Sequence, residues 1–164
     1  MATDSIRNAL AGEIRGNQVS LTTLKGDIVN DRTAIAAGEG SGMRTLVDEG
    51  GNISARDTLT IKSARDLTNS SAISSGGDAS LSATRDLNLL RPESRRVQRW
   101  RQCDHQLRTR HHAGGNLTLI SEGDQRYQVA KLESGKDITL DSGFVQGYLW
   151  SWGSHVEDVE YRPT

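Results

Sequence analysis

The chain has 164 residues, enough for one domain with a continuous core and too few for two domains to be expected. It contains 17 glycines, two prolines and one phenylalanine, and 34% of its residues are hydrophobic, a composition typical of many short strands joined by turns. The formal net charge of −1 argues against nucleic acid or an anionic membrane as the partner of the whole chain.

The cysteine content and the N-terminal segment bear on the compartment. Cys103 is the single cysteine, so no internal disulfide can form. No stretch approaches the roughly 18 consecutive apolar residues of a membrane span, and Met1 to Leu10 lacks the apolar region of a signal peptide. These features fit an intracellular chain or a segment of a longer exported protein, and the internal repeats favour the exported segment.

Along the chain, apolar residues alternate with small polar residues. Period two predicts strands, and no window of a dozen residues has sustained helical spacing. The alternation predicts short strands around residues 19–21, 53–55, 59–61, 79–83, 87–89, 117–119 and 138–140.

Turn phrases recur between these strands. The segment 76–89 restates 50–61 at an offset of 26 residues, and related Gly-containing phrases begin at Gly114 and Gly135. Asp66 and Asp86 are twenty residues apart, which predicts coils of about twenty residues with two or three strands each. One such coil cannot bury its inner face alone, so the repeats predict coils stacked in parallel register as a β-solenoid.

The recurring Gly, Asn and Asp residues have an expected role at the coil corners. Corners need residues that tolerate positive φ, and a short Asp side chain can accept a hydrogen bond from a nearby backbone amide. This explanation applies to Asp57, Asp66, Asp86 and Asp137, which might otherwise be taken for catalytic carboxylates.

Two segments interrupt the repeats. Between Arg91 and His112 seven arginines face only two acidic residues, and residues 144–164 are rich in aromatics. A shorter irregularity at 36–49 is expected to be a surface loop at a coil corner. We therefore expect a single unit over residues 1–164, with coils at about 10–89 and 114–143 and one or two protruding β-hairpin excursions at 90–113 and 144–164.

Three phrases carry a family resemblance: Val-Ser-Leu-Thr-Thr-Leu-Lys-Gly-Asp-Ile-Val-Asn at 19–30, Gly-Gly-(Asn/Asp)-x-(Ser/Thr)-(Leu/Ala), and Ala-x-Arg-Asp-Leu-x-Leu. Over about residues 10–143 the chain resembles the haemagglutinin repeats of bacterial two-partner secreted exoproteins, the filamentous haemagglutinin and contact-dependent growth inhibition (CdiA) family. The resemblance implies a right-handed parallel β-helix rod, exported through an outer-membrane transporter to a Gram-negative cell surface. Neither a secretion domain nor a toxin domain is recognised in these residues.

The expected function is therefore structural. The chain would be a filament segment of a surface-exported adhesin or growth-inhibition protein, spacing or presenting binding and effector regions, with no enzymatic activity and no cofactor. Expected partners are the transporter of the full-length protein and a receptor or glycan on a host or neighbouring cell, with end-to-end or edge association of the rods. No nucleic-acid partner is expected.

An alternative is a receptor- or carbohydrate-binding module. Arginines can bind oxyanions and Trp100 can stack on a sugar, although the same segment also fits a solvated hairpin leaning on the coils. Tyr148, Trp150 and Trp152 alternate along one predicted strand, where they could recognise a ligand or cover the end of the stack. The candidate binding surface comprises Arg95, Arg96, Arg99, Trp100, Arg101, Arg108, Arg110, Tyr148, Trp150 and Trp152.

Metal binding and catalysis have weaker support. Cys103, His105, His111 and His112 fall within ten residues, but their spacing matches no standard zinc site and adjacent histidines of a strand face opposite sides. No metal site is therefore predicted. A solenoid polysaccharide hydrolase remains a minor alternative, and it requires carboxylates of neighbouring coils to face a common groove.

Overall fold

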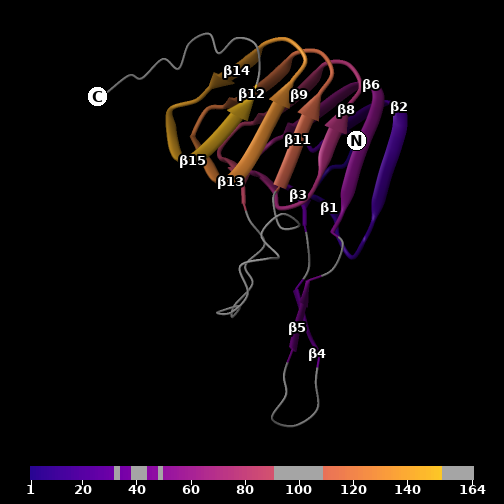
Figure 1. The fold of residues 1–164 in the computed structure, drawn as a ribbon. Coiled ribbons are helices and arrows are strands. Elements are labelled where there is room, and N and C mark those ends of the chain that lie inside the picture. Colours follow the sequence, from indigo (N-terminus) through magenta and orange to yellow (C-terminus); the bar gives the residue numbers. More distant parts are fainter. Residues whose placement is uncertain (32–33, 38–43, 48–49, 91–108, 153–164) are drawn as a thin grey trace.

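The computed structural model spans the chain and describes residues 1–31, 34–37, 44–47, 50–90 and 109–152. Every regular element in these residues is a strand. A sheet of 13 parallel strands closes almost completely around one core, as in a β-solenoid, and two further strands form a separate antiparallel pair (Figure 1). The strands are β1 (Ile6–Asn8), β2 (Glu13–Thr22), β3 (Ile28–Asn30), β4 (Ala34–Ala37), β5 (Arg44–Val47), β6 (Asn52–Ser63), β7 (Leu67–Asn69), β8 (Ile73–Ser75), β9 (Ala79–Ala83), β10 (Leu87–Leu89), β11 (Thr109–Ala113), β12 (Leu117–Ser121), β13 (Asp124–Ser134), β14 (Ile138–Asp141) and β15 (Phe144–Trp152).

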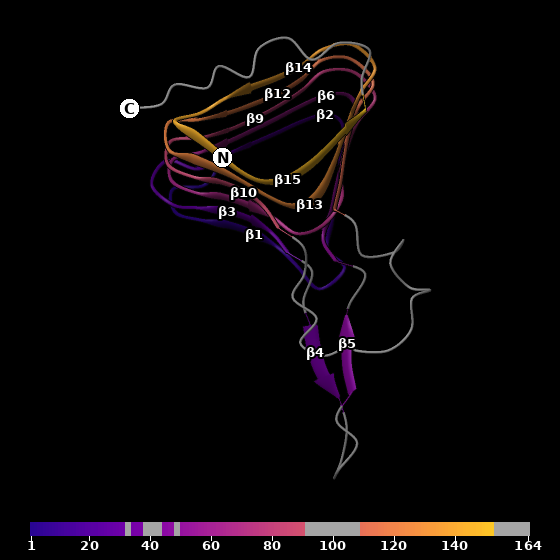
Figure 2. The same ribbon diagram turned by 60° about the vertical axis from the view of Figure 1, so that its left-hand side comes forward.

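The parallel strands form three walls, which repeat in the same order in each coil (Figure 2). Wall A contains β1, β3, β7, β10 and the first halves of β13 and β15. Wall B contains the first halves of β2 and β6, then β8, β11 and the second halves of β13 and β15. Wall C contains the second halves of β2 and β6, then β9, β12 and β14. We call the whole assembly of parallel strands the coil stack.

The strand register confirms a coil of about twenty residues. Ile53 pairs with Ile73, and Leu67 pairs with Leu87. The offset of 26 residues between the two most similar phrases is not the structural repeat. Gly76 lies one coil above Arg56, because its amide donates to the Ala55 carbonyl at 3.0 Å, whereas Gly51 ends the preceding corner.

Apolar ladders run through the stack because equivalent inward positions lie directly above one another. Leu59, Ala79, Leu117 and Ile138 form one such ladder in wall C, and each is almost fully buried. Burying a Leu or Ile side chain contributes about 1.5 to 3 kcal/mol. The strands expected from the alternating pattern are confirmed at 19–21, 53–55, 59–61, 79–83, 87–89, 117–119 and 138–140.

The core also holds polar side chains, which the alternation did not reveal. In wall A, the Asn8 amide donates to Asn30 at 2.9 Å, and the Asn30 amide donates to Asn69 at 2.6 Å. Asn69 in turn contacts the His111 ring in wall B at 2.6 Å. We call this buried row, Asn8, Asn30, Asn69 and His111, the amide ladder. It satisfies amide groups that would be costly to bury alone.

Several expected boundaries require correction. Residues 109–113 and 144–152 were expected in excursions, but they form β11 and β15, which both pair with β13. The N-terminal residues also belong to the coil stack, since β1 pairs with β3 and Ala2 bridges to Thr23. The expected loop at 36–49 overlaps the hairpin strands β4 and β5, which project from the stack (Figure 1). The rest of both excursions, 91–108 and 153–164, lies outside the described residues.

The glycines at the corners are explained by close stacking. Among the described residues, only Leu10, Ala11 and Gly50 have positive φ, so the expectation of positive φ at the corner Asp and Asn residues is wrong. A Cβ at Gly114 would instead overlap the carbonyl oxygen of Gly76 in the coil below, and a Cβ at Gly135 would overlap that of Gly114. Consecutive backbones approach too closely at this corner for a side chain.

Candidate functional site

The structure places part of the predicted binding surface on the outside of wall B. Arg110 in β11 is exposed. The strand β15 carries Tyr148, Trp150 and Trp152, although the structure describes only their backbone. Arg95, Arg96, Arg99, Trp100, Arg101 and Arg108 lie outside the described residues.

Strand pairing aligns Arg110 with the C-terminal aromatics. Arg110 pairs with Lys131, and Lys131 pairs with Trp150, so the three residues occupy one column across three neighbouring coils. His112, Glu133 and Trp152 form the adjacent column. Two parts of the sequence that were singled out separately therefore share one wall, with strands about 4.8 Å apart.

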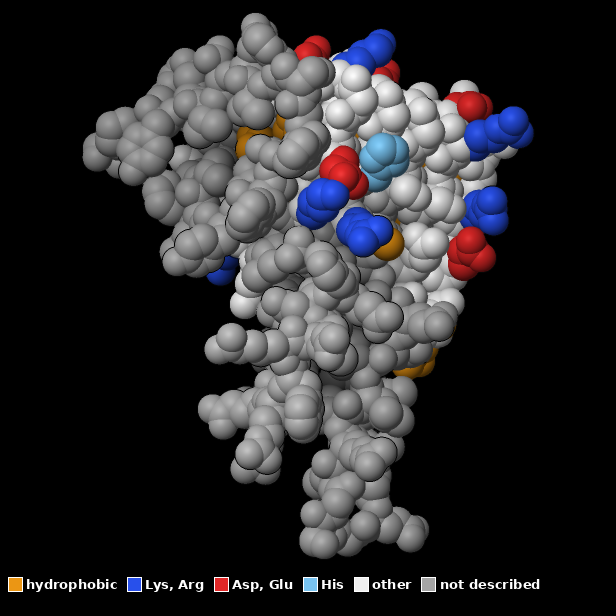
Figure 3. All heavy atoms as spheres, viewed as in Figure 1, with side chains coloured by type: hydrophobic (Ala, Val, Ile, Leu, Met, Phe, Trp, Pro, Cys, Tyr) orange, Lys and Arg blue, Asp and Glu red, His pale blue; other side chains and the backbone are white. Residues whose placement is uncertain are grey.

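Charged groups on this wall interact with one another. The Lys131 ammonium forms an ion pair with Glu133, and this hydrogen bond lowers the pKa of the Glu133 carboxyl, with smaller effects from His112 and Arg110. Arg110 makes no ion pair with any described residue. Figure 3 shows basic, acidic and histidine side chains gathered over β11 and β13. This arrangement leaves the exposed Arg110 guanidinium able to bind an anionic ligand.

The adjacent histidines lie on opposite sides of β11, as expected from strand geometry. His111 is 1% exposed and stacks between Ile73 and Leu132, whereas His112 is exposed. Burial lowers the pKa of His111 to about 4, so the ring is neutral at physiological pH. The described residues contain no group of three or more His, Cys, Asp or Glu side chains placed to hold a metal; Cys103 and His105 lie outside them.

Asp66 and Asp86, two of the four repeated aspartates, lie at the corner between walls C and A, and their carboxylates accept hydrogen bonds from backbone amides. The Asp66 carboxylate accepts from the Asp86 amide at 3.3 Å, and the Asp86 carboxylate accepts from the Asp124 amide at 3.0 Å. Arg85 holds Asp66 in a bidentate ion pair, and this hydrogen bonding lowers the pKa of the Asp66 carboxyl. At the corner between walls B and C, the Asp137 amide similarly donates to the Asn116 side chain at 3.4 Å.

Comparison of the chain with known protein families, with characterised proteins and with solved structures finds no match. A search of the described residues for helices that could cross a membrane finds none.

Proposed function

We propose that the chain is a filament segment of a two-partner secreted adhesin or contact-dependent growth inhibition protein, and that its coils wind as a right-handed parallel β-helix. The observation that carries the proposal is the stack of coils of about twenty residues, which keeps one order of walls throughout. Ile28 pairs with Leu67 on either side of the β4–β5 hairpin, and Ile73 pairs with His111 on either side of the segment 91–108. Each coil adds about 4.8 Å of length without changing the cross-section. Right-handed crossovers are the strong preference for parallel strands of one sheet.

The way insertions are accommodated supports a presenting role. The β4–β5 hairpin lies between β3 and β6, and the segment 91–108 lies between β10 and β11. Both insertions therefore fall between a strand of wall A and the following strand of wall B, two coils apart. Inserted segments at one corner of a repeat architecture are displayed on one side, where they can be varied without disturbing the core.

Export through a transporter partner is part of the proposal and rests on the resemblance to haemagglutinin repeats. It also suits the topology. In the described residues each strand pairs only with strands of adjacent coils, so coils can form one after another as a chain emerges from a pore. Edge or end-to-end association of such rods is part of the same proposal.

A non-enzymatic role is also proposed. The aspartates Asp66 and Asp86 are the residues most easily mistaken for a catalytic pair, and both accept hydrogen bonds from the next coil. A hydrolytic pair must leave its carboxylates free to face the substrate. Because the Asp66 and Asp86 carboxylates already bind backbone amides at the corner, they support a structural role for the chain.

The export test places the chain as passenger behind the secretion domain of a two-partner exoprotein in a Gram-negative host. With the cognate outer-membrane transporter, an epitope on the passenger should become accessible to protease on intact cells. Without the transporter it should remain protected, as should a periplasmic marker in both strains. Retention of the passenger inside cells that carry a working transporter contradicts the proposal.

The alternative function, recognition of a glycan or receptor, is favoured by the column that joins Arg110, Lys131 and Trp150. Arrays of glycans and cell-binding measurements on the whole chain test it. If wall B recognises a ligand, Arg110→Gln and Trp150→Ala should each weaken binding at least about tenfold, consistent with loss of a charged hydrogen bond or a stacked ring. Binding that survives both substitutions, or that falls equally with Arg126→Gln on wall A, removes this alternative.

A further inference from the structure

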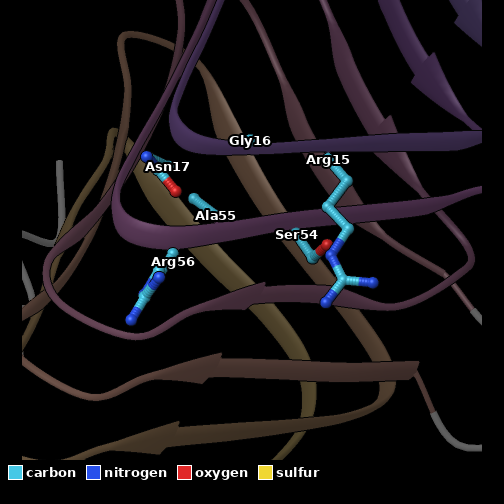
Figure 4. Close-up of a pocket in the computed structure, with 6 residues that line it drawn as sticks. All are labelled: Arg15, Gly16, Asn17, Ser54, Ala55 and Arg56. Atoms are coloured by element: carbon cyan, nitrogen blue, oxygen red, sulfur yellow. The ribbon is translucent and has the colours of Figure 1, made fainter.

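A hollow of about 490 Å³ lies at the corner between walls B and C in the first two coils, away from the predicted binding surface (Figure 4). Neighbouring strands β2 and β6 line it, and each contributes three consecutive residues. These are Arg15, Gly16 and Asn17 of β2, with Ser54, Ala55 and Arg56 of β6.

The hollow exists because the two corners differ in length. Gly16 pairs with Ala55 and Gln18 pairs with Thr58, so the β2 corner has one residue where the β6 corner has two. The next corner keeps the length of the β6 corner, because Ala55 pairs with Ser75 and Leu59 pairs with Ala79. It is tied to the corner above it, since Asp78 accepts a hydrogen bond from the Asn116 amide at 2.7 Å. At the first two coils the register shifts between β2 and β6, and among the described residues no comparable side-chain hydrogen bond connects the two corners.

The side chains around the hollow are rich in hydrogen-bond donors and include no carboxylate. Figure 4 shows the Arg15 guanidinium beside Ser54, with Asn17 and Arg56 on the other side of Ala55. Two guanidinium groups, an amide and a hydroxyl can all donate to oxygen. Gly16 has no side chain and Ala55 has only a methyl group, so neither blocks access from the solvent to the donor groups.

The two arginines are weakly neutralised. Arg56 forms no ion pair with any described residue, and Arg15 approaches only Glu13, at 3.9 Å with both side chains largely exposed. By contrast, Arg85 and Arg126 each pair with an aspartate on the same coil stack. An exposed pair at 3.9 Å is worth little in water, so both guanidinium groups remain available to a ligand.

We propose that this hollow is a binding site for an oxyanion carried by a small polar ligand, either the carboxylate of a sugar acid or a phosphate group. Arg15 and Arg56 bind the oxyanion, and Ser54 and Asn17 bind neighbouring hydroxyl groups. Guanidinium groups suit oxyanions because they offer parallel N–H donors, and the volume is in the range of small-molecule sites. The site does not depend on the filament proposal, because it rests on the residues of β2 and β6 alone.

The test is a titration of the isotope-labelled chain, followed by backbone amide shifts, with glucuronate, inorganic phosphate and glucose as separate probes. Glucuronate or phosphate should produce saturable shifts at Asn17, Ser54 and Arg56, and the neutral sugar should not. The stronger of the two anionic probes identifies the source of the oxyanion. Raising the salt concentration should weaken the binding of either anion.

Variants test whether the residues of the hollow bind the anion. Arg15→Gln combined with Arg56→Gln should weaken the anion at least about tenfold, because two charged hydrogen-bonding groups are lost. Arg126→Gln, an arginine outside the hollow, should leave the affinity unchanged. Either of two results overturns the proposal: the absence of saturable shifts at the hollow with both anions, or an equal loss of affinity in the Arg126 variant.

Discussion

Asn69 of β7 and His111 of β11 are joined by a buried hydrogen bond of 2.6 Å between Nδ2 and Nε2. The same Asn69 nitrogen donates to the Ser71 carbonyl at 2.8 Å, which uses one of its two hydrogens. The second hydrogen is directed to His111, so Nε2 is the acceptor and the neutral ring carries its proton on Nδ1. The contact connects wall A to wall B inside the core.

Acid should destabilise the chain through His111. Its pKa falls from 6.5 to about 4 on folding, so the unfolded chain binds this proton first as the pH drops. The contribution to stability is constant above pH 6.5 and is lost between pH 6.5 and 4, by about 3 kcal/mol. Urea unfolding at pH 7, 5.5 and 4.5 measures the loss.

Two substitutions separate this effect from other titrations. His111→Gln should flatten the stability profile between pH 6.5 and 4, whereas His112→Gln, on the exposed side of the same strand, should keep it. The pKa of the Asp66 carboxyl is lowered in the folded chain. Its contribution to stability is therefore lost at lower pH than that of His111, as the carboxylate is protonated. A steep profile that persists in the His111 variant would exclude the histidine as its cause.

Asn30→Ala should be strongly destabilising. Asn30 accepts a hydrogen bond from Asn8 and donates one to Asn69. Its removal therefore leaves each of these two buried side-chain amides without one hydrogen-bond partner. The expected cost is about 2 to 5 kcal/mol in the free energy of unfolding. Asn88→Ala, at a half-buried outward position of the same wall, should change it by less than about 0.5 kcal/mol. Equal melting temperatures for the two variants would show that the amide ladder contributes nothing to stability.

Gly114→Ala should disturb the stacking of coils. The added methyl would overlap the Gly76 carbonyl oxygen, and the backbone cannot move aside without breaking its own pairing. We expect a loss of about 1 to 3 kcal/mol, typical of overpacking. At Gly143 the nearest atom to an added Cβ is the Glu122 carbonyl oxygen at 3.3 Å, so Gly143→Ala should cost less. Chemical denaturation of both variants checks this order, and the reverse order would refute the close-stacking explanation.

Removal of one whole coil should leave a folded chain. Deleting residues 67–86 brings Asn30 to the position that Asn69 occupies beside His111, and every remaining strand keeps its wall. Deleting only 67–76 shifts the following strands to the wrong wall and should abolish cooperative folding. Far-ultraviolet circular dichroism and thermal unfolding of both deletions provide the measurement. A folded ten-residue deletion would contradict the coil length.

Much of the coil stack was predictable from local pattern. Leu59 and Ile61 alternate with polar residues, which predicts inward and outward positions without knowledge of the neighbours. The spacing of Asp66 and Asp86 predicted the coil length, and their carboxylates accept backbone amides as expected. The strand β15 was harder to predict, since its aromatic residues do not follow the alternation of apolar and small polar residues seen in the other coils.

The sequence by itself determined that the chain forms short strands, that they repeat at about twenty residues, and that the corners carry Gly, Asn and Asp. These properties depend on side chains close together along the chain. Only the tertiary structure decided that Asn69 meets His111, that Arg110 aligns with Trp150, and that Arg15 and Arg56 surround a hollow. Such contacts depend on the register between coils, which is set by stacking and by the length of each insertion, and local pattern contains neither.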